Sequence, residues 1–229
     1  MAMIQANIAR VQGEINAVLK RLRRDPQDIT LVCVTKYATP SMIDEALGAG
    51  ISHIGENKVQ EASEKFFSLK PGAAVWHMIG HLQTNKVKDA LKIFNVIQSL
   101  DSEKLARAIN AAAAKLKLRV DILVQVNTAQ ESQKYGISCE GTVPLIKEGS
   151  RMENLRVLGL MAMAPATQDL EIVRSSFSKL RLLRDQVQNE VSGKENVQMK
   201  YLSMGMSSDY KIALEEGSNM IRVGRAIFG

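Results

Sequence analysis

The chain has 229 residues, of which 45% are hydrophobic and 24% charged, a balance that excludes wholesale disorder. No stretch approaches the roughly 18 consecutive apolar residues of a membrane span, so we expect no membrane association. The net charge of +6 suggests nucleic-acid binding, but the basic residues are interleaved with acidic ones and only 4% of residues are aromatic, so none is expected.

Hydrophobic periodicity predicts one helix followed by a repeated unit of strand and helix. Apolar residues share one helical face from Ile4 to Leu22, so an amphipathic helix is expected over residues 3–23, ended by Asp25-Pro26. Eight β-rich runs follow, at residues 31–36, 51–56, 74–80, 95–101, 119–127, 155–162, 197–205 and 219–224. Each run except the last is followed by a predicted helix, at residues 41–50, 59–69, 82–94, 102–118, 140–149, 169–191 and 207–217.

This alternation predicts an α/β protein with a closed (β/α)8 TIM-type barrel and an extra N-terminal helix. No linker or low-complexity stretch divides the chain, so we expect one domain, 1–229, with residues 1–25 forming a helix packed on the barrel. A Rossmann-like open sheet is the alternative. Against it, no G-x-G-x-x-G motif follows the first strand and no P-loop is present.

Cysteine use and the N-terminal residues predict a cytoplasmic protein. Cys33 and Cys139 are too few for a disulfide scaffold, and Cys33 lies in an apolar run that is typical of a small buried hydrophobe. The N-terminus does not resemble a signal peptide, because polar residues such as Gln5 and Arg10 interrupt any apolar segment.

Lys36 is the first candidate functional residue, because sites in β/α barrels lie at the C-terminal ends of the strands. Val32, Val34 and Lys36 alternate onto one face of the first strand. A lysine in the barrel mouth is partly desolvated, which makes its neutral amine available to form a Schiff base with an aldehyde. The alternative is a surface lysine at a frayed strand end.

The loops after the seventh and eighth strands predict a phosphate site. Ser207 and Ser208 open a predicted helix after the seventh strand, and Gly224 and Arg225 follow the eighth. Glycine lets the backbone approach a ligand closely, while hydroxyl and free N–H groups donate to phosphate oxygens. Ordinary N-capping of the helix by serine is the alternative.

Other polar residues are predicted near the barrel mouth. Arg222 shares a face with Gly224 and needs an acceptor, which a phosphate, a ligand ring nitrogen or a neighbouring carboxylate would provide. Asn57 follows the second strand and is a further hydrogen-bonding candidate, although Asn is also common in plain loops. His77 and His81 are four residues apart, but no cysteine or nearby carboxylate completes a ligand set, so no metal site is expected.

Motifs spread over the chain resemble those of the pyridoxal phosphate homeostasis protein family. The match runs from about residue 29 to the C-terminus, whereas the first helix matches only loosely. Its segments are VTKYATP around Lys36, IGENKVQE, WHMIGHLQTNK, SQKYGI, VLGLMAMAP, LSMGMSSDYKIALEEGS and MIRVGRAIFG.

The resemblance implies a single-domain barrel, similar to the N-terminal domain of alanine racemase, that holds pyridoxal 5′-phosphate. Carried over by position, Lys36 would form the internal aldimine and Arg222 would face the pyridine nitrogen. The phosphate would be held by Ser207, Ser208, Gly224 and Arg225, and the pocket would be lined by Asn57, Met161 and Ser203. Because the family often has threonine where this chain has Arg225, only the backbone N–H of Arg225 is carried over.

The resemblance favours a binding protein over an enzyme. A guanidinium does not readily give up a proton, so the pyridine would stay unprotonated and be a poor electron sink. Racemases of this kind use a second base from another domain, and this sequence ends at Gly229, shortly after the eighth strand. We therefore expect a cytoplasmic homeostasis protein that buffers pyridoxal phosphate and delivers it to apo-enzymes without strong catalysis.

Two alternatives remain open, a weak racemase-like enzyme that uses pyridoxal phosphate and a cofactor-free Schiff-base aldolase that acts on phosphosugars. Lys134, just past the fifth strand, could take part in release of the cofactor, although a solvated loop lysine is the favoured interpretation. We expect a monomer, because no strongly apolar surface helix demands a partner.

Overall fold

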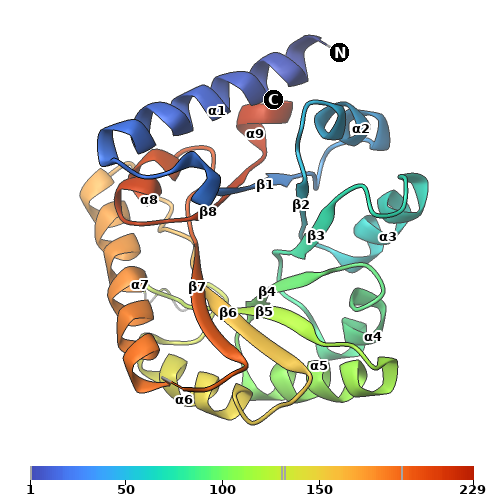
Figure 1. Ribbon diagram of the computed structural model, residues 1–229, viewed down its shortest axis with the longest axis vertical. Helices are drawn as coiled ribbons and strands as arrows, with labels where there is room; N and C mark the ends of the chain where they lie inside the picture. The colour runs from blue at the N-terminus through green and yellow to red at the C-terminus, as the bar shows by residue number, and fades with distance from the viewer. Residues whose placement is uncertain (1, 130, 132, 192) are drawn as a thin grey trace.

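Eight parallel strands of the described residues close into a barrel in the order β1 to β8 (Figure 1). The computed structural model describes residues 2–129, 131, 133–191 and 193–229, so Ser132 of the SQKYGI motif lies outside the described residues. The strands are β1 (Thr30–Val34), β2 (His53–Glu56), β3 (Val75–Met78), β4 (Val96–Leu100), β5 (Val120–Gln125), β6 (Leu155–Met161), β7 (Val197–Ser203) and β8 (Met220–Val223). Pairing of β1 with β8 closes the sheet, which confirms the predicted barrel and excludes an open Rossmann-like sheet.

Helices surround the barrel (Figure 1). They are α1 (Ala2–Leu22), α2 (Pro40–Gly48), α3 (Val59–Ser68), α4 (Val87–Ala90), α5 (Glu103–Leu116), α6 (Cys139–Gly149), α7 (Leu170–Glu190), α8 (Tyr210–Glu215) and α9 (Arg225–Phe228), with 3₁₀ turns at Pro26–Asp28 and Thr84–Lys86. None of the helices in the described part of the chain combines the length and the apolar character that a membrane crossing requires.

Three sequence predictions about helices were wrong in detail. The helix expected over 82–94 is reduced to the Thr84–Lys86 turn and α4, and the chain beyond Ala90 forms a turn in which Leu91, Ile93 and Phe94 are buried. The helix expected over 207–217 begins only at Tyr210. A short helix, α9, follows β8, where none was expected, and its Ile227 is fully buried.

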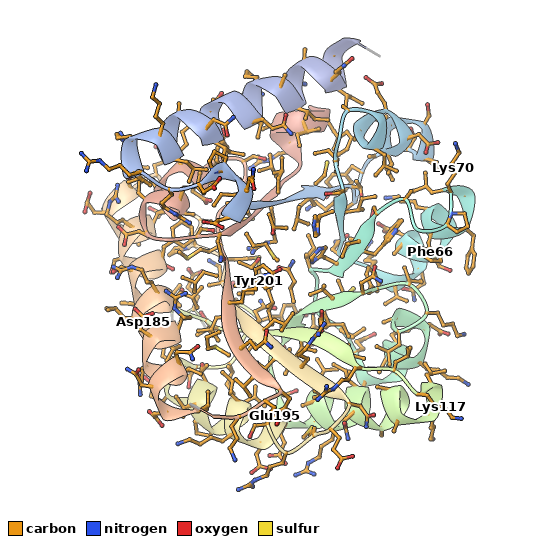
Figure 2. The ribbon with its side chains drawn as sticks, in the orientation of Figure 1. Phe66, Lys70, Lys117, Asp185, Glu195 and Tyr201 are labelled. Atoms are coloured by element: carbon orange, nitrogen blue, oxygen red, sulfur yellow. The ribbon has the colours of Figure 1, made fainter. Side chains whose placement is uncertain are left out.

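The barrel interior holds an apolar cluster with few aromatic residues, alongside buried polar side chains such as Gln98 and Ser203. Val32, Leu123, Leu158, Met161 and Met220 form the interior cluster, and the partly buried Tyr201 of β7, labelled in Figure 2, packs against it. A larger apolar layer lies between the strands and the surrounding helices. The labelled charged side chains in Figure 2, which are Lys70, Lys117, Asp185 and Glu195, are exposed around the outside.

Helix α1 packs across α2, α8 and α9 (Figure 1). Its buried stripe runs from Ile4 to Leu19 and belongs to one apolar cluster with Ile221 and Val223 of β8. Cys33 lies in the same cluster, fully buried, and burial raises the pKa of its thiol to about 12. The interpretation of Cys33 as a small buried hydrophobe is therefore confirmed.

Glu14 connects α1 to α8, and we expect this contact to make stability depend on pH. Its Oε2 accepts a hydrogen bond from Tyr210 Oη at 2.7 Å and pairs with Lys211 Nζ at 2.6 Å. Hydrogen bonds from Lys211 and Tyr210 lower the pKa of Glu14 from its ordinary 4.5 to about 2. A lowered folded-state pKa means that the stabilisation is complete above the ordinary value and is lost as the pH falls through about 2.

The measurement is urea unfolding of the wild type and Glu14→Gln between roughly pH 7 and pH 2. The wild type should be the more stable protein at neutral pH, and the difference in free energy of unfolding should shrink below pH about 4.5. A difference that stays constant down to pH 2 would show that the charge of Glu14 does not stabilise this contact.

Candidate functional site

A cavity of about 890 Å³ opens at the C-terminal ends of the strands. Its volume lies in the range of small-molecule sites, and its position is the one expected for a β/α barrel. Most of the predicted site residues line it, namely Lys36, Asn57, Ser207, Arg222, Gly224 and Arg225. The walls also include residues of the loops after β2 and β3 and Tyr135.

Lys36 enters the cavity two residues after the end of β1. The residue is half-buried, and its Nζ lies 4.9 Å from the centroid of the exposed Tyr37 ring. Among the described residues that line the cavity, the charged ones are all cations: Lys36, Lys58, Lys86, Arg222 and Arg225. A cleft lined by one sign of charge attracts ligands of the opposite sign, so this cavity suits an anion.

The loops after β7 and β8 lie side by side at one edge of the cavity. Ser207 Oγ accepts a hydrogen bond from the backbone N–H of Ala226 at 3.2 Å, which joins the loop after β7 to the first turn of α9. A Cβ at Gly224 would lie 3.0 Å from the carbonyl oxygen of Val34, so glycine permits this close approach of β8 to β1. The edge therefore offers the hydroxyl of Ser207 and the side chain of Arg225 to an anion.

Ser208 is placed differently from Ser207. It is exposed, its Oγ donates to Asp209 Oδ2 at 3.4 Å, and it is not among the residues that line the cavity. The expectation that these serines open a helix was wrong, because the N-cap position of α8 is Asp209. Asp209 Oδ1 accepts from the backbone N–H of Met206 at 2.6 Å, which keeps residues 206–209 in a turn.

Arg222 forms part of the cavity and is 3% exposed. Its Nη1 donates to Ser203 Oγ at 2.6 Å and its Nη2 to the carbonyl oxygen of Ala162 at 2.8 Å. Burial lowers the pKa of Arg222 to about 10, so the guanidinium stays charged at neutral pH. Because it has five N–H donors, Arg222 retains donors for a ligand.

Met161 and Ser203 lie beneath the cavity and not in its wall. Met161 is fully buried among the apolar side chains of the interior cluster. Ser203 is also fully buried, and its hydroxyl accepts from Arg222 and donates to Gln98. Both residues therefore support the floor of the cavity.

Asn57 contributes a buried acceptor to the cavity wall. Its Oδ1 is inaccessible to solvent and has no hydrogen-bond partner among the described atoms. Since buried polar atoms are almost always paired in proteins, this oxygen is an unsatisfied acceptor within the wall.

Sequence comparisons identify the family. The family model described as alanine racemase, N-terminal domain, matches residues 7–229. The chain is 38% identical to the pyridoxal phosphate homeostasis protein of Aquifex aeolicus (strain VF5), over 97% of this chain and 96% of the relative. It is 33% identical to the protein of the same name from Escherichia coli (strain K12), over 99% and 96%.

The chain belongs to the pyridoxal phosphate homeostasis protein family. The resemblance inferred from the motifs is thereby confirmed. Among solved structures, PipY of Synechococcus elongatus PCC7942 with pyridoxal phosphate bound is 29% identical, with a TM-score of 0.84 over 99% of this chain and 100% of that one. An alanine racemase of Clostridium difficile 630 is 16% identical with a TM-score of 0.78, and the chain spans 57% of it, so this likeness shows the fold alone.

A buried cluster that the sequence analysis missed supports two cavity residues of this family member. Glu56 is fully buried, and its Oε1 accepts from Thr35 Oγ1 at 2.6 Å and from Lys65 Nζ at 2.8 Å. Lys65 Nζ also donates to the carbonyl oxygen of Thr35 at 2.7 Å. Because Thr35 precedes Lys36 and Glu56 precedes Asn57, this cluster fixes the backbone from which both cavity side chains extend.

The two histidines considered for a metal lie in different places. His81 lines the cavity and stacks on Tyr135, with ring centroids 4.1 Å apart, whereas His77 lies inside the barrel. Among the described residues, no group of three His, Cys, Asp or Glu is placed to hold a metal ion.

Lys134 is not the freely solvated loop lysine that we favoured. Its Nζ donates to Glu131 Oε1 at 2.9 Å and to the carbonyl oxygen of Ala164 at 3.1 Å, and its side chain is 23% exposed. It is not among the residues that line the cavity.

Proposed function

We propose that this protein holds pyridoxal 5′-phosphate reversibly in the cavity at the strand ends and serves pyridoxal phosphate homeostasis by passing the cofactor to apo-enzymes. The observation that carries the proposal is a half-buried primary amine, Lys36, in a cavity where all the charged residues that the structure describes are cations. Membership of the homeostasis family and the pyridoxal phosphate bound by PipY support it.

The residues present fit the cofactor. When bound, pyridoxal phosphate supplies an aldehyde that condenses with a primary amine, with loss of water. Lys36 offers that amine, while Ser207, Gly224 and Arg225 would hold the phosphate, with Ser208 in the same turn. Asn57 Oδ1 remains as an unfilled acceptor in the wall.

Arg222 favours storage over catalysis. Its remaining N–H groups would donate to the pyridine nitrogen, and a guanidinium that is still charged at neutral pH does not hand over its proton. The ring would thus stay unprotonated and withdraw electrons weakly. We propose that the protein holds the cofactor without strong catalysis.

A weak amino-acid racemase-like activity is the second candidate, favoured by His81 and Tyr135. Both titratable side chains line the same cavity as Lys36, where they are placed to exchange protons with a bound amino acid. Turnover of L-alanine that disappears in Lys36→Ala would support this candidate. Absence of turnover in a fully loaded protein would leave storage as the function.

We expect Lys36→Ala to lose covalent capture of pyridoxal phosphate and to bind it roughly tenfold more weakly or worse, because the carbon–nitrogen bond is gone. The measurement is the visible absorption spectrum after incubation with pyridoxal phosphate, followed by borohydride reduction and peptide mass mapping. The wild type should be yellow and carry the reduced adduct on Lys36.

Lys104→Ala is the matched control, because Lys104 is an exposed lysine on α5, away from the cavity wall. It should bind and be modified like the wild type. A wild-type protein that stays colourless and unmodified would overturn the proposal and favour a phosphosugar aldolase that needs no cofactor.

A further inference from the structure

A chain of hydrogen bonds, which we call the floor network, runs through the barrel interior beneath the cavity. Arg222 Nη1 donates to Ser203 Oγ at 2.6 Å, and Ser203 Oγ donates to Gln98 Oε1 at 2.6 Å. Gln98 Nε2 lies 2.9 Å from His77 Nδ1, and His77 Nε2 lies 2.9 Å from His53 Nδ1. The network joins β8, β7, β4, β3 and β2, and it extends from the cavity to the half-buried His53 at the start of β2.

Two groups with a single hydrogen-bonding role, Arg222 as a donor and Met220 Sδ as an acceptor, set the direction of the central hydrogen bonds. Arginine only donates, so the Ser203 oxygen must accept from Arg222 and its single proton goes to Gln98 Oε1. Met220 Sδ lies 3.2 Å from Gln98 Nε2, and a thioether sulfur only accepts. The amide nitrogen of Gln98 therefore faces Met220 and His77, and its oxygen faces Ser203.

The state of His77 follows from the same geometry. Because Gln98 donates to Nδ1, the proton of a neutral His77 lies on Nε2, which donates to His53 Nδ1. His77 is 1% exposed, and burial lowers its pKa to about 3, so the ring is neutral over the physiological range. In each hydrogen bond of the floor network, the donor is thus the residue nearer to Arg222 along the network.

The two central residues of the floor network have their hydrogen-bonding groups engaged within it. Gln98 and Ser203 are fully buried, and each has a donor group and an acceptor oxygen engaged. If Gln98 could not accept a hydrogen bond from Ser203, the Ser203 hydroxyl would rotate toward another acceptor. That rotation would disturb the hydrogen bond that Ser203 Oγ accepts from Arg222. Losing one partner of a buried polar pair leaves the other unsatisfied at an energetic cost.

We propose that Gln98 and His77 are positioning residues that act through Ser203 to hold the Arg222 guanidinium with its free N–H groups toward the cavity. The inference rests on the proposed function, since it assigns those N–H groups to the pyridine nitrogen of pyridoxal phosphate. Neither Gln98 nor His77 is among the described residues that line the cavity, so each acts only through its neighbour.

The first test needs no cofactor. Nitrogen-15 spectra of the imidazole rings in the unloaded protein should show His77 neutral, with Nε2 protonated and Nδ1 unprotonated, at pH 6 to 8. The chain has three histidines, so His53→Gln and His81→Gln variants assign the signals. A His77 that is charged, or protonated on Nδ1, would overturn the direction of the floor network and with it the proposal.

The second test uses the loaded protein. Gln98→Leu should still form the borohydride-reducible adduct on Lys36, but its absorption maximum should shift and it should release the cofactor roughly two- to tenfold faster, as expected for one weakened hydrogen bond. Ser203→Ala cuts the floor network beside Arg222 and should give the same shift. It keeps the test decisive if Gln98→Leu fails to fold.

Ser99→Ala is the matched control, because Ser99 is a neighbouring residue of β4 that is also fully buried but outside the floor network. Its spectrum and release rate should match those of the wild type. Folded Gln98→Leu and Ser203→Ala proteins that both match the wild type would overturn the positioning role. Failure of the wild type to bind pyridoxal phosphate would instead contradict the proposed function, while the nitrogen-15 test still decides the floor network.

Discussion

Replacing Lys65 by methionine is expected to destabilise the fold by about 3–5 kcal/mol, because it leaves the buried carboxylate of Glu56 without its cationic partner. Glu56 is fully buried, and the side chain of Lys65, its ion-pair partner, is only 12% exposed. The distance from Lys65 Nζ to Glu56 Oε1 is 2.8 Å. Without the ammonium, Glu56 Oε1 keeps a hydrogen bond from Thr35, and Glu56 Oε2 has no partner among the described atoms. Urea unfolding of the unloaded protein measures the loss.

The matched control is Lys92→Met, which breaks the exposed pair with Asp89 and should change stability by less than about 1 kcal/mol. The double variant Lys65→Met with Glu56→Gln should recover part of the loss, since it removes the stranded charge. A Lys65→Met protein within about 1 kcal/mol of the wild type would show that water reaches Glu56 and that the pair contributes little.

The barrel could be predicted because the sequence repeats one simple unit. Eight apolar strands separated by helices of suitable length, with no linker, leave few topologies other than a closed parallel barrel. The errors fell on α4, α8 and α9, which have four to six residues each. Periodicity over so few residues does not separate a helix from a turn.

The cavity residues could be predicted for a related reason. A polar residue at the end of a parallel strand must lie near the mouth of the barrel, so Lys36, Arg222 and the loop residues Ser207 and Gly224 were found from position alone. The sequence also contained a signal for the floor network that we did not use. Gln98 and Ser99 are polar residues in a buried strand, and a buried amide requires partners.

Depth within the barrel could not be predicted. Met161 and Ser203 end β6 and β7, yet both lie under the cavity. The pairing of β6 with β5 shifts register between Ile122 and Leu123, and its pairing with β7 shifts between Val157 and Gly159. Such irregularities break the strict alternation of side chains along a strand. Counting residues along the strand therefore no longer gives the position of a side chain along the barrel axis.

Replacing Gly80 by alanine is expected to destabilise the fold by about 3 kcal/mol and to weaken retention of pyridoxal phosphate. A Cβ at this position would lie 2.2 Å from the carbonyl oxygen of Asn57 and 2.8 Å from its Cα. Because these are backbone atoms, no side-chain rotation relieves the clash, and the loop after β3 must move away from the loop after β2. Both Gly80 and Asn57 line the cavity, so the movement deforms its wall.

Unfolding free energy and the rate of cofactor release, measured on the same preparation, separate the two effects. Gly13→Ala is the matched control, because a Cβ there meets nothing within 4 Å in the middle of α1. It should stabilise the protein by about 0.5–1 kcal/mol, since alanine favours a helix over glycine, and should leave release unchanged. If Gly80→Ala behaved like Gly13→Ala, the close contact between the loops after β2 and β3 would not hold the cavity wall.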